Sequence, residues 1–437
     1  MDQLADHATR LLSRLIAHNT VNPPGNERAL QEELAADLQE AGFEVTLVGR
    51  TEERPNLVAR LRGAADGPTL CLTSHCDTVL ANAEEWDHDP WSGEVIDGEL
   101  WGRGAIDMKS QTAAEVAAGI ELAKSGWRPA QGDLLILCVV DEETGGDDGI
   151  AWLCENHEEL VRCDYSINEG AGAFFELGDE RLYGVCVAEK GVCRFKITTD
   201  GVAGHASNPR FGDNALLKLA PLVTALGEWD PVYDLTDGAR ALMAELGAPV
   251  EGDDGAGALG RLREAAPLLA GFVEPMLGVT FAPTVISASQ KINVLPSRAE
   301  LRVDCRTPPG LGEELVRRRL GDAIGTEGYR LEFTEQTIGN GSAIESPLMD
   351  SIRGWVERND PGARTVPVVL PAFTDSRTLR ATFPDSVAYG FFPMRHTSLA
   401  EMWPLMHAPN ERIDLRDLAD AANCFSEIAQ ELLGSAS

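Results

Sequence analysis

The chain has 437 residues, of which 43% are hydrophobic and 24% charged, a composition typical of a globular protein. At about 150 residues per domain, this length is enough for two or three domains. Seventy acidic and 37 basic side chains give a formal net charge of −33, which would repel a phosphate backbone, so we expect no nucleic-acid partner. No apolar run approaches the ~18–20 residues that a membrane span needs, so we expect no membrane partner either.

The cysteines and the N-terminal segment indicate the cellular compartment of the protein. The nine cysteines are scattered without CxxC pairs, and Cys71, Cys138 and Cys186 lie inside apolar, strand-like runs. This pattern is typical of small core residues in a reducing environment. Residues 1–20 lack a basic leader and a small-residue cleavage site, and their apolar positions have the spacing of an amphipathic helix. We therefore expect a cytoplasmic protein.

Apolar runs rich in β-forming residues end abruptly in polar side chains at 69–73, 134–140 and 165–167. A Gly-rich turn at 101–107 and an Ala-rich helix, expected over about 111–124, lie between the first two runs. Strands that alternate with helices predict an α/β fold with a doubly wound, mostly parallel sheet, in which ligands bind outside the carboxyl ends of the strands. The polar residues expected at those ends are His75, Asp77, Glu142, Glu143 and Glu169.

The pattern changes near residue 191. Segments 193–199 and 299–305 alternate polar and apolar residues, as strands with one solvated face do. Helix-like stretches at 214–227 and 258–271 lie between them. We therefore expect an α+β segment that is inserted into the α/β domain.

The expected domain boundaries follow from these patterns. Residues 1–190 form the first part of a catalytic domain, 191–306 form the inserted α+β domain, and 307–437 form the second part of the catalytic domain. The α/β pattern is expected to resume with a helix at 313–324 and a strand at 329–334, and to end with a helix at 414–433.

Carboxylates and histidines at neighbouring strand ends suit divalent metals, with zinc the leading candidate. One catalytic zinc needs only three protein ligands, and the larger number here suits a two-metal site in which one carboxylate bridges ions about 3.5–4 Å apart. Glu142 is then a surplus acid, free to face the bound water as a general base while its neighbour ligates. The candidate ligands are His75, Asp107, Glu143, Glu169 and one further histidine near the C-terminus.

Simpler explanations exist for each residue. A Glu-Glu pair in an acid-rich chain is usually solvated, and Asp107 could be a helix N-cap. The chain could also be a metal-binding scaffold without chemistry, although a pure binding site has no use for an unligated acid such as Glu142. The histidines expected to be surface or packing residues are His7, His18, His88, His157 and His396.

Three linked motifs, HCDTV at 75–79, WGRGAIDMK at 101–109 and DEETGG at 141–146, resemble those of the co-catalytic zinc exopeptidase and deacylase family. Members of this family include glutamate carboxypeptidase, acetylornithine deacetylase, succinyl-diaminopimelate desuccinylase, aminoacylase and several dipeptidases. The order and spacing match across nearly the whole chain. The resemblance implies two Zn²⁺ per subunit, with Co²⁺ or Mn²⁺ as alternatives.

The resemblance also implies a metal-binding role for each matching residue. His75 and Glu169 would hold one zinc. Glu143 and His407 would hold the other, and Asp107 would bridge the two ions. His407 lies in LMHAPNE at 405–411, which matches the family's late histidine with its trailing acid.

Two further roles concern the chemistry. Asp77 would orient His75 as a carboxylate partner, and Glu142 would be the general base. His205, in the sequence GHAS, matches the family's lid histidine, which in dimeric members reaches into the partner's active site as an oxyanion donor. A lid-packing residue is the alternative for His205.

The resemblance assigns substrate binding to Asn293 and Arg306, which match positions that grip the substrate's carboxylate. A salt bridge between Arg306 and Asp304 is the alternative. The inserted segment resembles the family's lid, which in many members is also the dimerisation domain, so the sequence is compatible with a homodimer. Extra helical material at 228–280 leaves the dimer geometry open.

The expected function is hydrolysis of an amide bond next to a free carboxylate, in an N-acyl amino acid or a short peptide. The alternative is a dipeptidase or aminopeptidase that recognises a free amino terminus. The sequence leaves the acyl group and the preferred side chain open.

Overall fold

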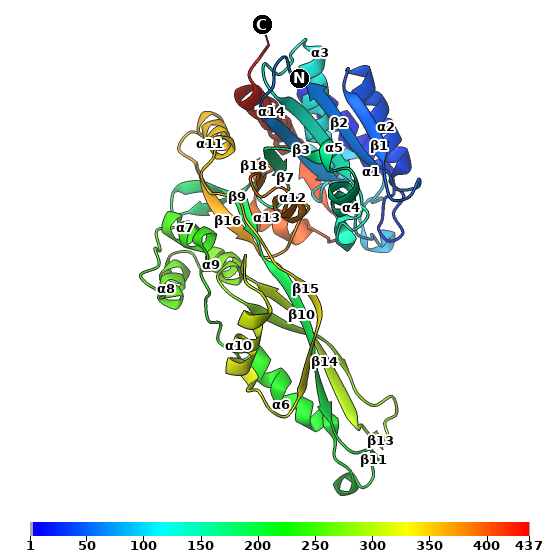
Figure 1. The fold of residues 1–437 in the computed structure, drawn as a ribbon, viewed down its shortest axis with the longest axis vertical. Helices are drawn as coiled ribbons and strands as arrows, with labels where there is room; N and C mark the ends of the chain where they lie inside the picture. The colour runs from blue at the N-terminus through cyan, green and yellow to red at the C-terminus, as the bar shows by residue number, and fades with distance from the viewer. Residues whose placement is uncertain (1–2, 437) are drawn as a thin grey trace. The chain divides into compact units, whose positions relative to one another are not determined.

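The computed structural model describes residues 3–436, which form two compact units (Figure 1). The first unit contains the residues up to Val187, Ser342–Val368 and the segment from Thr374 onward. The second unit contains Ala188–Gly341 and Val369–Phe373. Within residues 3–436, no helix combines the length and the apolar character needed to span a membrane.

The first unit is built on a ten-stranded mixed sheet whose central strands are parallel. These strands are apolar along nearly their whole length because helices cover both faces of the sheet. The expected α/β fold with a mostly parallel central sheet is thereby confirmed. The parallel strands are, in order, β6 (Asp133–Val139), β3 (Thr69–His75), β7 (Tyr165–Asn168) and β17 (Val387–Gly390). The outer strands are β1 (Glu44–Val48), β2 (Asn56–Arg62), β8 (Ala173–Leu177), β9 (Glu180–Glu189), β16 (Arg364–Leu370) and β18 (Met394–Ser398).

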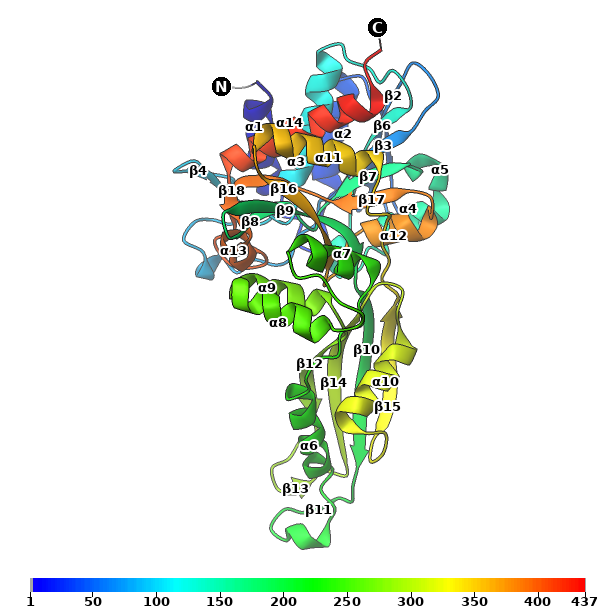
Figure 2. The same cartoon turned by 90° about the vertical axis from the view of Figure 1, so that its left-hand side faces the viewer.

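Helices lie on both faces of this sheet. On one face α3 is buried all around its circumference, because α1 and α14 cover its outer side. Gly119 lets α3 approach β6 closely, since a Cβ there would lie 2.5 Å from Ile136 Cδ1. This face carries α1 (Gln3–Ala17), α2 (Arg28–Glu40), α3 (Lys109–Lys124), α11 (Pro347–Asn359) and α14 (Leu415–Leu433), most of which Figure 2 shows side by side. The opposite face carries α4 (Ile150–Asn156), α5 (Glu158–Val161) and α12 (Ser376–Thr382).

A small three-stranded sheet joins distant parts of the first unit. Its strands are β4 (Val95–Ile96), β5 (Glu99–Trp101) and β19 (Arg412–Asp414), and β19 pairs antiparallel with β5. The turn that follows β5 therefore lies next to the segment that precedes β19. This pairing brings residues 102–107 close to residues 407–411.

The second unit contains a four-stranded antiparallel sheet with the order β12-β14-β10-β15. Two helices pack on one face of it, around a core that includes Phe195, Leu219, Leu301 and Val316. A short sheet of β11 (Gly204–His205) and β13 (Val294–Leu295) lies beyond one end. The main elements are β10 (Gly191–Asp200), β12 (Thr280–Ser287), β14 (Arg298–Thr307), β15 (Arg330–Thr337), α6 (Ala215–Gly227) and α10 (Glu313–Ile324).

Two sequence predictions differ from the structure here. The inserted unit continues past residue 306, because β15 pairs with β10 and α10 packs on the same sheet. The single helix expected over 258–271 is two helices, α8 (Gly255–Ala265) and α9 (Pro267–Val273), preceded by α7 (Asp237–Glu245). Pro267 separates α8 from α9 because proline has no N–H for a continuing helix and fits the first position of a new one.

Candidate metal centre

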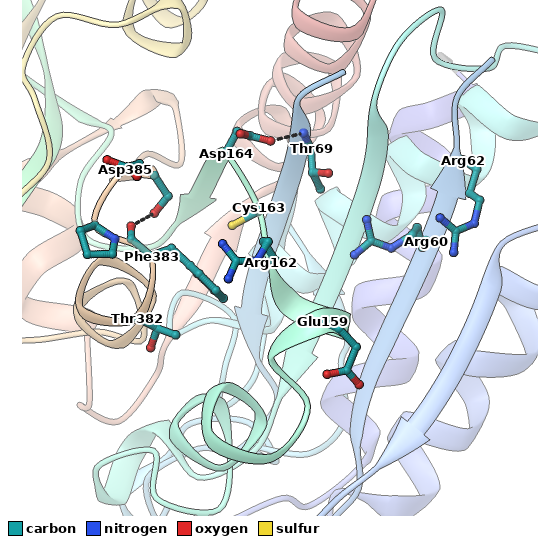
Figure 3. A pocket seen from close by; sticks show the side chains of 12 residues that line it. Arg60, Arg62, Thr69, Glu159, Arg162, Cys163, Asp164, Thr382, Phe383 and Asp385 are labelled. Atoms are coloured by element: carbon teal, nitrogen blue, oxygen red, sulfur yellow. Dashed lines mark hydrogen bonds between the residues drawn. The ribbon is translucent and has the colours of Figure 1, made fainter. Parts of the chain in front are cut away.

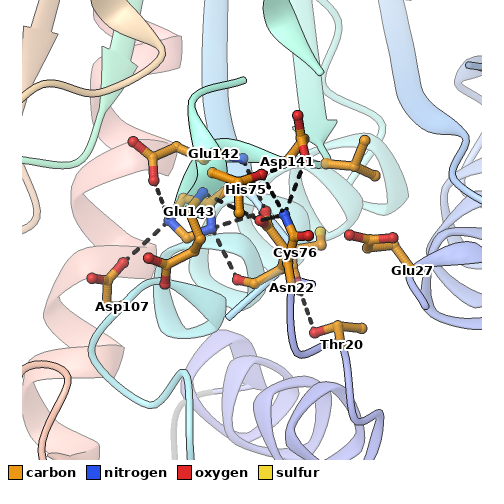
Figure 4. A network of polar contacts seen from close by, with 12 residues as sticks. Thr20, Asn22, Glu27, His75, Cys76, Asp107, Asp141, Glu142 and Glu143 are labelled. Carbon is orange, nitrogen blue, oxygen red and sulfur yellow. Dashed lines mark hydrogen bonds and ion pairs between the residues drawn. The ribbon is translucent and has the colours of Figure 1, made fainter. Parts of the chain in front are cut away.

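His75, Asp107 and His407 form the centre of a polar cluster in the first unit. Figure 4 shows His75 and Asp107 in this cluster. His75 is the last residue of β3 and is buried. Its Nε2 lies 3.1 Å from Asp107 Oδ1, and His407 Nε2 lies 2.9 Å from Asp107 Oδ2. The carboxylate of Asp107 therefore has one oxygen for each imidazole.

Asp107 does not cap a helix. The N-cap of α3 is Met108, and no side chain caps the helix there. Glu411, fully buried, accepts hydrogen bonds from the backbone N–H groups of Ile106 (2.6 Å) and Asp107 (3.0 Å), which fixes the turn from which Asp107 projects. The sequence identified Glu411 only as the acid trailing His407.

Three glutamates complete the cluster. Glu143 Oε2 lies 3.4 Å from His407 Nε2, and Glu169 Oε1 lies 3.6 Å from His75 Nε2. Glu142 and Glu143 occupy one 3₁₀ turn, where consecutive side chains point about 120° apart. Glu142 Oε2 lies 4.0 Å from His75 Nε2, on the side of Glu169. Ligand atoms lie within 4.8 Å of one another in two groups: His75 with Glu142 and Glu169, and His75 with Asp107 and Glu143.

Asp77 contacts His75 through both its backbone and its carboxylate. His75 Nδ1 lies 3.0 Å from the backbone oxygen of Asp77 and 3.5 Å from its carboxylate oxygen Oδ1. The Asp77 carboxylate also accepts hydrogen bonds from the backbone N–H groups of Glu142 and Glu143, both at 3.2 Å. Asp77 therefore contacts both the imidazole and the glutamate turn.

The electrostatics of the cluster favour added positive charge. Burial raises the pKa values of Glu142, Glu143 and Glu169, and like charge among the neighbouring acids raises them further. Hydrogen bonds to Asp107 and Glu143 raise the pKa of His407 to about 10. The acids outnumber the imidazoles, and oxygen and nitrogen donors of this kind suit zinc and similar divalent ions. The residues present therefore fit a metal site.

His205 and Asn293 lie in the second unit. His205 is exposed in β11, and its Nδ1 lies 2.8 Å from Ser207 Oγ, so it is not a packing residue. Asn293 is also exposed. It lies close to His205, because the backbone N–H of the neighbouring Ala206 donates to the backbone oxygen of Asn293 at 3.0 Å. The structure thus brings His205 and Asn293 together.

Arg306 lies at the opposite end of the second unit's sheet. In the antiparallel register Arg306 faces Val192, whereas Arg298, which faces Asp200, lies near the end that carries His205. Eight residues of strand separate the two ends by about 26 Å. Arg306 forms the alternative salt bridge, with Nε 2.8 Å from Asp304 Oδ1, while its Nη1 has no hydrogen-bond partner among the described residues. One copy of the chain therefore does not bring Asn293 and Arg306 to the same point.

Two other polar features of the first unit lie outside the cluster. His396, Asp417 and Asp420 form a third group with ligand spacing, but Arg395 pairs with Asp420 at 3.0 Å. Asp417 accepts from two backbone N–H groups and a hydroxyl. These hydrogen bonds and the ion pair account for the group without a metal ion.

A cavity with three arginines lies at the amino ends of β3 and β7, opposite the end that carries His75 (Figure 3). Each arginine has an acidic partner outside the cavity lining. The pairs are Arg60 with Asp133, Arg62 with Glu44 and Arg162 with Glu158. The cavity therefore carries no uncompensated positive charge from these residues.

Comparison with known proteins places the chain in a family. The model of Peptidase family M20/M25/M40 matches residues 71–431, most of the chain and every proposed metal ligand. The chain therefore belongs to this family, and the resemblance in its sequence motifs is confirmed.

Curated relatives include two bacterial enzymes. The succinyl-diaminopimelate desuccinylase of Xanthobacter autotrophicus is 34% identical over 221 residues, which cover 49% of this chain and 55% of that protein. Succinyl-diaminopimelate desuccinylase 2 of a Ruegeria species is 32% identical over 232 residues, covering 51% and 56% respectively. The chain thus spans about half the length of the curated relatives it matches.

Solved structures share the fold over the whole chain. An M20 family metallo-carboxypeptidase from Sulfolobus solfataricus has a TM-score of 0.73 at 17% identity and covers 99% of this chain and 100% of its own. Human carnosine dipeptidase 1 has a TM-score of 0.65 at 15% identity, with 98% and 97% covered. At 17% and 15% identity, these similarities show a shared fold and nothing further.

Proposed function

We propose that the chain is a metal-dependent hydrolase that cleaves an amide bond next to a free carboxylate, in an N-acyl amino acid or a short peptide. The observation that carries this proposal is the placement of Asp107 between His75 and His407, with one carboxylate oxygen near each imidazole. A carboxylate shared in this way suits two neighbouring metal ions. Membership of the M20/M25/M40 family supports the same activity.

The proposed ligands divide between two zinc ions. His75 and Glu169 would hold one ion, Glu143 and His407 would hold the other, and Asp107 would bridge them. Such ions lower the pKa of a bound water and polarise a carbonyl group. Co²⁺ and Mn²⁺ are the alternative metals.

Glu142 is the proposed general base. Its carboxylate lies at the edge of the cluster, on the same side as Glu169, and belongs to a turn that Asp77 holds through two backbone N–H groups. In this position it would take a proton from the attacking water and deliver it to the leaving amine. Asp77 would keep Glu142 and His75 in fixed relation.

Arg306 is the proposed partner of the substrate's free carboxylate. Its Nε is occupied by Asp304, but its buried Nη1 has no hydrogen-bond partner among the described residues. A carboxylate offered to Nη1 would satisfy this donor with a charge-assisted hydrogen bond.

We further propose that two copies associate, so that the partner subunit's His205 and the partner subunit's Asn293 complete the site. Three observations support this: the ~26 Å between the two ends of the sheet, the unpaired edge strand β12 and the exposed apolar side chains of the second unit. Strongly exposed apolar residues in this unit include Phe211 (82%), Leu217 (71%), Val285 (52%), Ile286 (55%) and Ile292 (101%).

The dimer proposal has a direct test by subunit mixing. Neither H205A nor E142Q should be active alone, but a mixed dimer would contain one site with both Glu142 and His205 intact. Random exchange should therefore restore about a quarter of wild-type activity, since half of the dimers are mixed and half of their sites are complete. No recovery after exchange, in mixed dimers demonstrated by mass spectrometry, would contradict the shared site.

We propose that the protein acts in the cytoplasm. All nine cysteines are buried, and none forms a disulfide within the described residues. Thiols kept in this form suit a reducing compartment.

A substrate panel tests the proposed reaction. The panel contains N-acetyl and N-succinyl amino acids, their carboxamides, and dipeptides with free amino termini, each assayed with zinc and with a chelator. We expect turnover of the N-acyl amino acids that the chelator abolishes. Turnover of free dipeptides alone would favour the dipeptidase or aminopeptidase alternative, and no metal-dependent turnover would refute the proposal.

A further inference from the structure

A buried ion pair lies behind the glutamate turn. The Arg54 guanidinium donates from Nε and Nη2 to the two carboxylate oxygens of Glu27, at 3.0 and 2.8 Å. Its remaining edge donates from Nη1 to Asp141 Oδ1 at 3.0 Å. The Glu27 side chain is fully buried and that of Arg54 is 13% exposed, so the pair is largely shielded from solvent. One guanidinium thus joins the start of α2 to the residue that precedes Glu142.

Asp141 has an unusual backbone conformation. Its φ is +74°, in the left-handed region that residues with a Cβ rarely adopt. Besides Arg54, its carboxylate accepts hydrogen bonds from Asn22 Nδ2 (3.1 Å), Thr144 Oγ1 (2.7 Å) and the backbone N–H of Asp148 (3.0 Å). These contacts hold the conformation from which the glutamate turn starts.

The same contacts reach the metal cluster through Asp77. Asn22 Nδ2 donates to Asp77 Oδ2 at 2.9 Å. It also donates to Asp141, as Figure 4 shows. The Asp77 carboxylate in turn holds the backbone N–H groups of Glu142 and Glu143. A shift of Asp141 would therefore move the proposed base and one proposed ligand.

Gly25 makes room for this arrangement. A Cβ at this position would lie 2.3 Å from Arg54 Nε and 2.5 Å from Arg54 Cζ, and the φ of Gly25 is +77°. Only glycine tolerates both the backbone conformation and the close approach. The loop before Glu27 is therefore shaped around the guanidinium.

We infer that Arg54, fixed by Glu27, is a positioning residue that sets the placement of Glu142 and Glu143. This inference rests on the proposed function, because it assigns the positioning to the proposed base and ligand. Arg54 also supplies positive charge next to the buried acids Asp141 and Glu27. A lysine would keep that charge but could not hold two carboxylates on opposite edges, because its ammonium is a single point donor.

The test compares R54K and R54A with R50A. Arg50 also pairs with the same loop, through Asp148 Oδ1 at 2.8 Å, but it is exposed and does not contact Asp141, so R50A is a matched control. Three quantities are measured for each variant: kcat and KM at saturating zinc, zinc affinity by competition with a chelator, and melting temperature. R54A is measured with and without added guanidinium, which fits the space left by the side chain.

If Arg54 positions the turn, R54K should lower kcat at least tenfold while KM changes less than threefold. R54A should in addition weaken zinc binding about tenfold, guanidinium should restore part of the loss, and R50A should match wild type. The inference would be overturned if kcat and zinc affinity stayed within threefold of wild type in both Arg54 variants while the melting temperature fell. That result would show that the ion pair only stabilises the fold. If wild type hydrolyses none of the amides, only the proposed function is refuted. The zinc affinity of the Arg54 variants still tests whether Arg54 positions the turn.

Discussion

Asp107 and His407 lie 300 positions apart in the chain, yet His407 Nε2 approaches Asp107 Oδ2 to 2.9 Å. The antiparallel pairing of β5 with β19 makes this contact, since Asp107 follows β5 and His407 precedes β19. Glu411 strengthens the connection by accepting hydrogen bonds from the backbone of the Asp107 turn. The candidate metal centre therefore depends on a small sheet that lies outside the main one.

Substitution of Asp107 tests the bridge. Asp107→Ala removes both oxygens, so we expect each proposed ion to lose one ligand and the purified protein to retain less than half of the wild-type zinc. Elemental analysis after dialysis measures this, with His396→Ala as a control at the third group of ligand-like residues. Full zinc occupancy in the Asp107 variant would show that this carboxylate does not bridge.

Substitution of Glu142 separates the base from the ligands. Glu142→Gln keeps the size of the side chain but removes proton acceptance, so turnover should fall by about 10²–10⁴. Zinc content should stay the same, because Glu142 is not among the proposed ligands. A variant that keeps more than a tenth of wild-type kcat would refute the assignment, and loss of zinc would make Glu142 a ligand instead.

Arg306 can be tested through substrate selectivity. Arg306→Ala should lower kcat/KM for an N-acyl amino acid. The loss of transition-state stabilisation should be roughly 2–4 kcal/mol, a typical loss for a buried charged pair. The matching carboxamide should lose far less, since it never made a charge-assisted hydrogen bond. An unchanged ratio of the two kcat/KM values, with a lowered melting temperature, would assign Arg306 to its Asp304 salt bridge alone.

Glu115 provides a test of pH-dependent stability away from the site. This acid is buried in α3, and desolvation raises its pKa well above the usual value, although Gln111 donates a hydrogen bond to it. The folded state therefore holds the proton more tightly than the unfolded state, so this residue's contribution to stability is lost as pH rises above about 4.5.

Glu115→Gln keeps the shape and removes the ionisation. Its free energy of unfolding, measured by urea denaturation and compared with that of wild type, should be larger at pH 8 than at pH 5, because only wild type must ionise a buried acid at the higher pH. Glu40→Gln, at an exposed position at the end of α2, is the control and should show no such change. The same difference at both pH values would contradict the buried, proton-retaining state of Glu115.

The sequence predicts the parts of the site that depend on local pattern. His75, Glu143 and Glu169 follow apolar runs, and the carboxyl ends of parallel strands converge, so their proximity follows from the fold class. Asn22 and Arg54 gave no such signal. Their contacts with Asp141 join residues 119 and 87 positions apart. The periodic pattern of polar and apolar residues cannot predict contacts between side chains so far apart in the chain.

The end of the inserted unit also escaped prediction. β15 alternates polar and apolar residues, a pattern that fits the edge of either sheet, and only its pairing with β10 assigns it to the second unit. The separation of Arg306 from Asn293 was hidden for a related reason. A strand pattern fixes which residues share a face, but the strand's length carries its two ends about 26 Å apart.

The most direct test of the two-metal claim is anomalous X-ray scattering at the zinc edge from crystals of the zinc-loaded protein. The account predicts two peaks that share Asp107, one about 2.0–2.2 Å from His75 Nε2 and Glu169, the other at the same distance from His407 Nε2 and Glu143. A single peak without Asp107 among its ligands, or no peak at these residues, would contradict it.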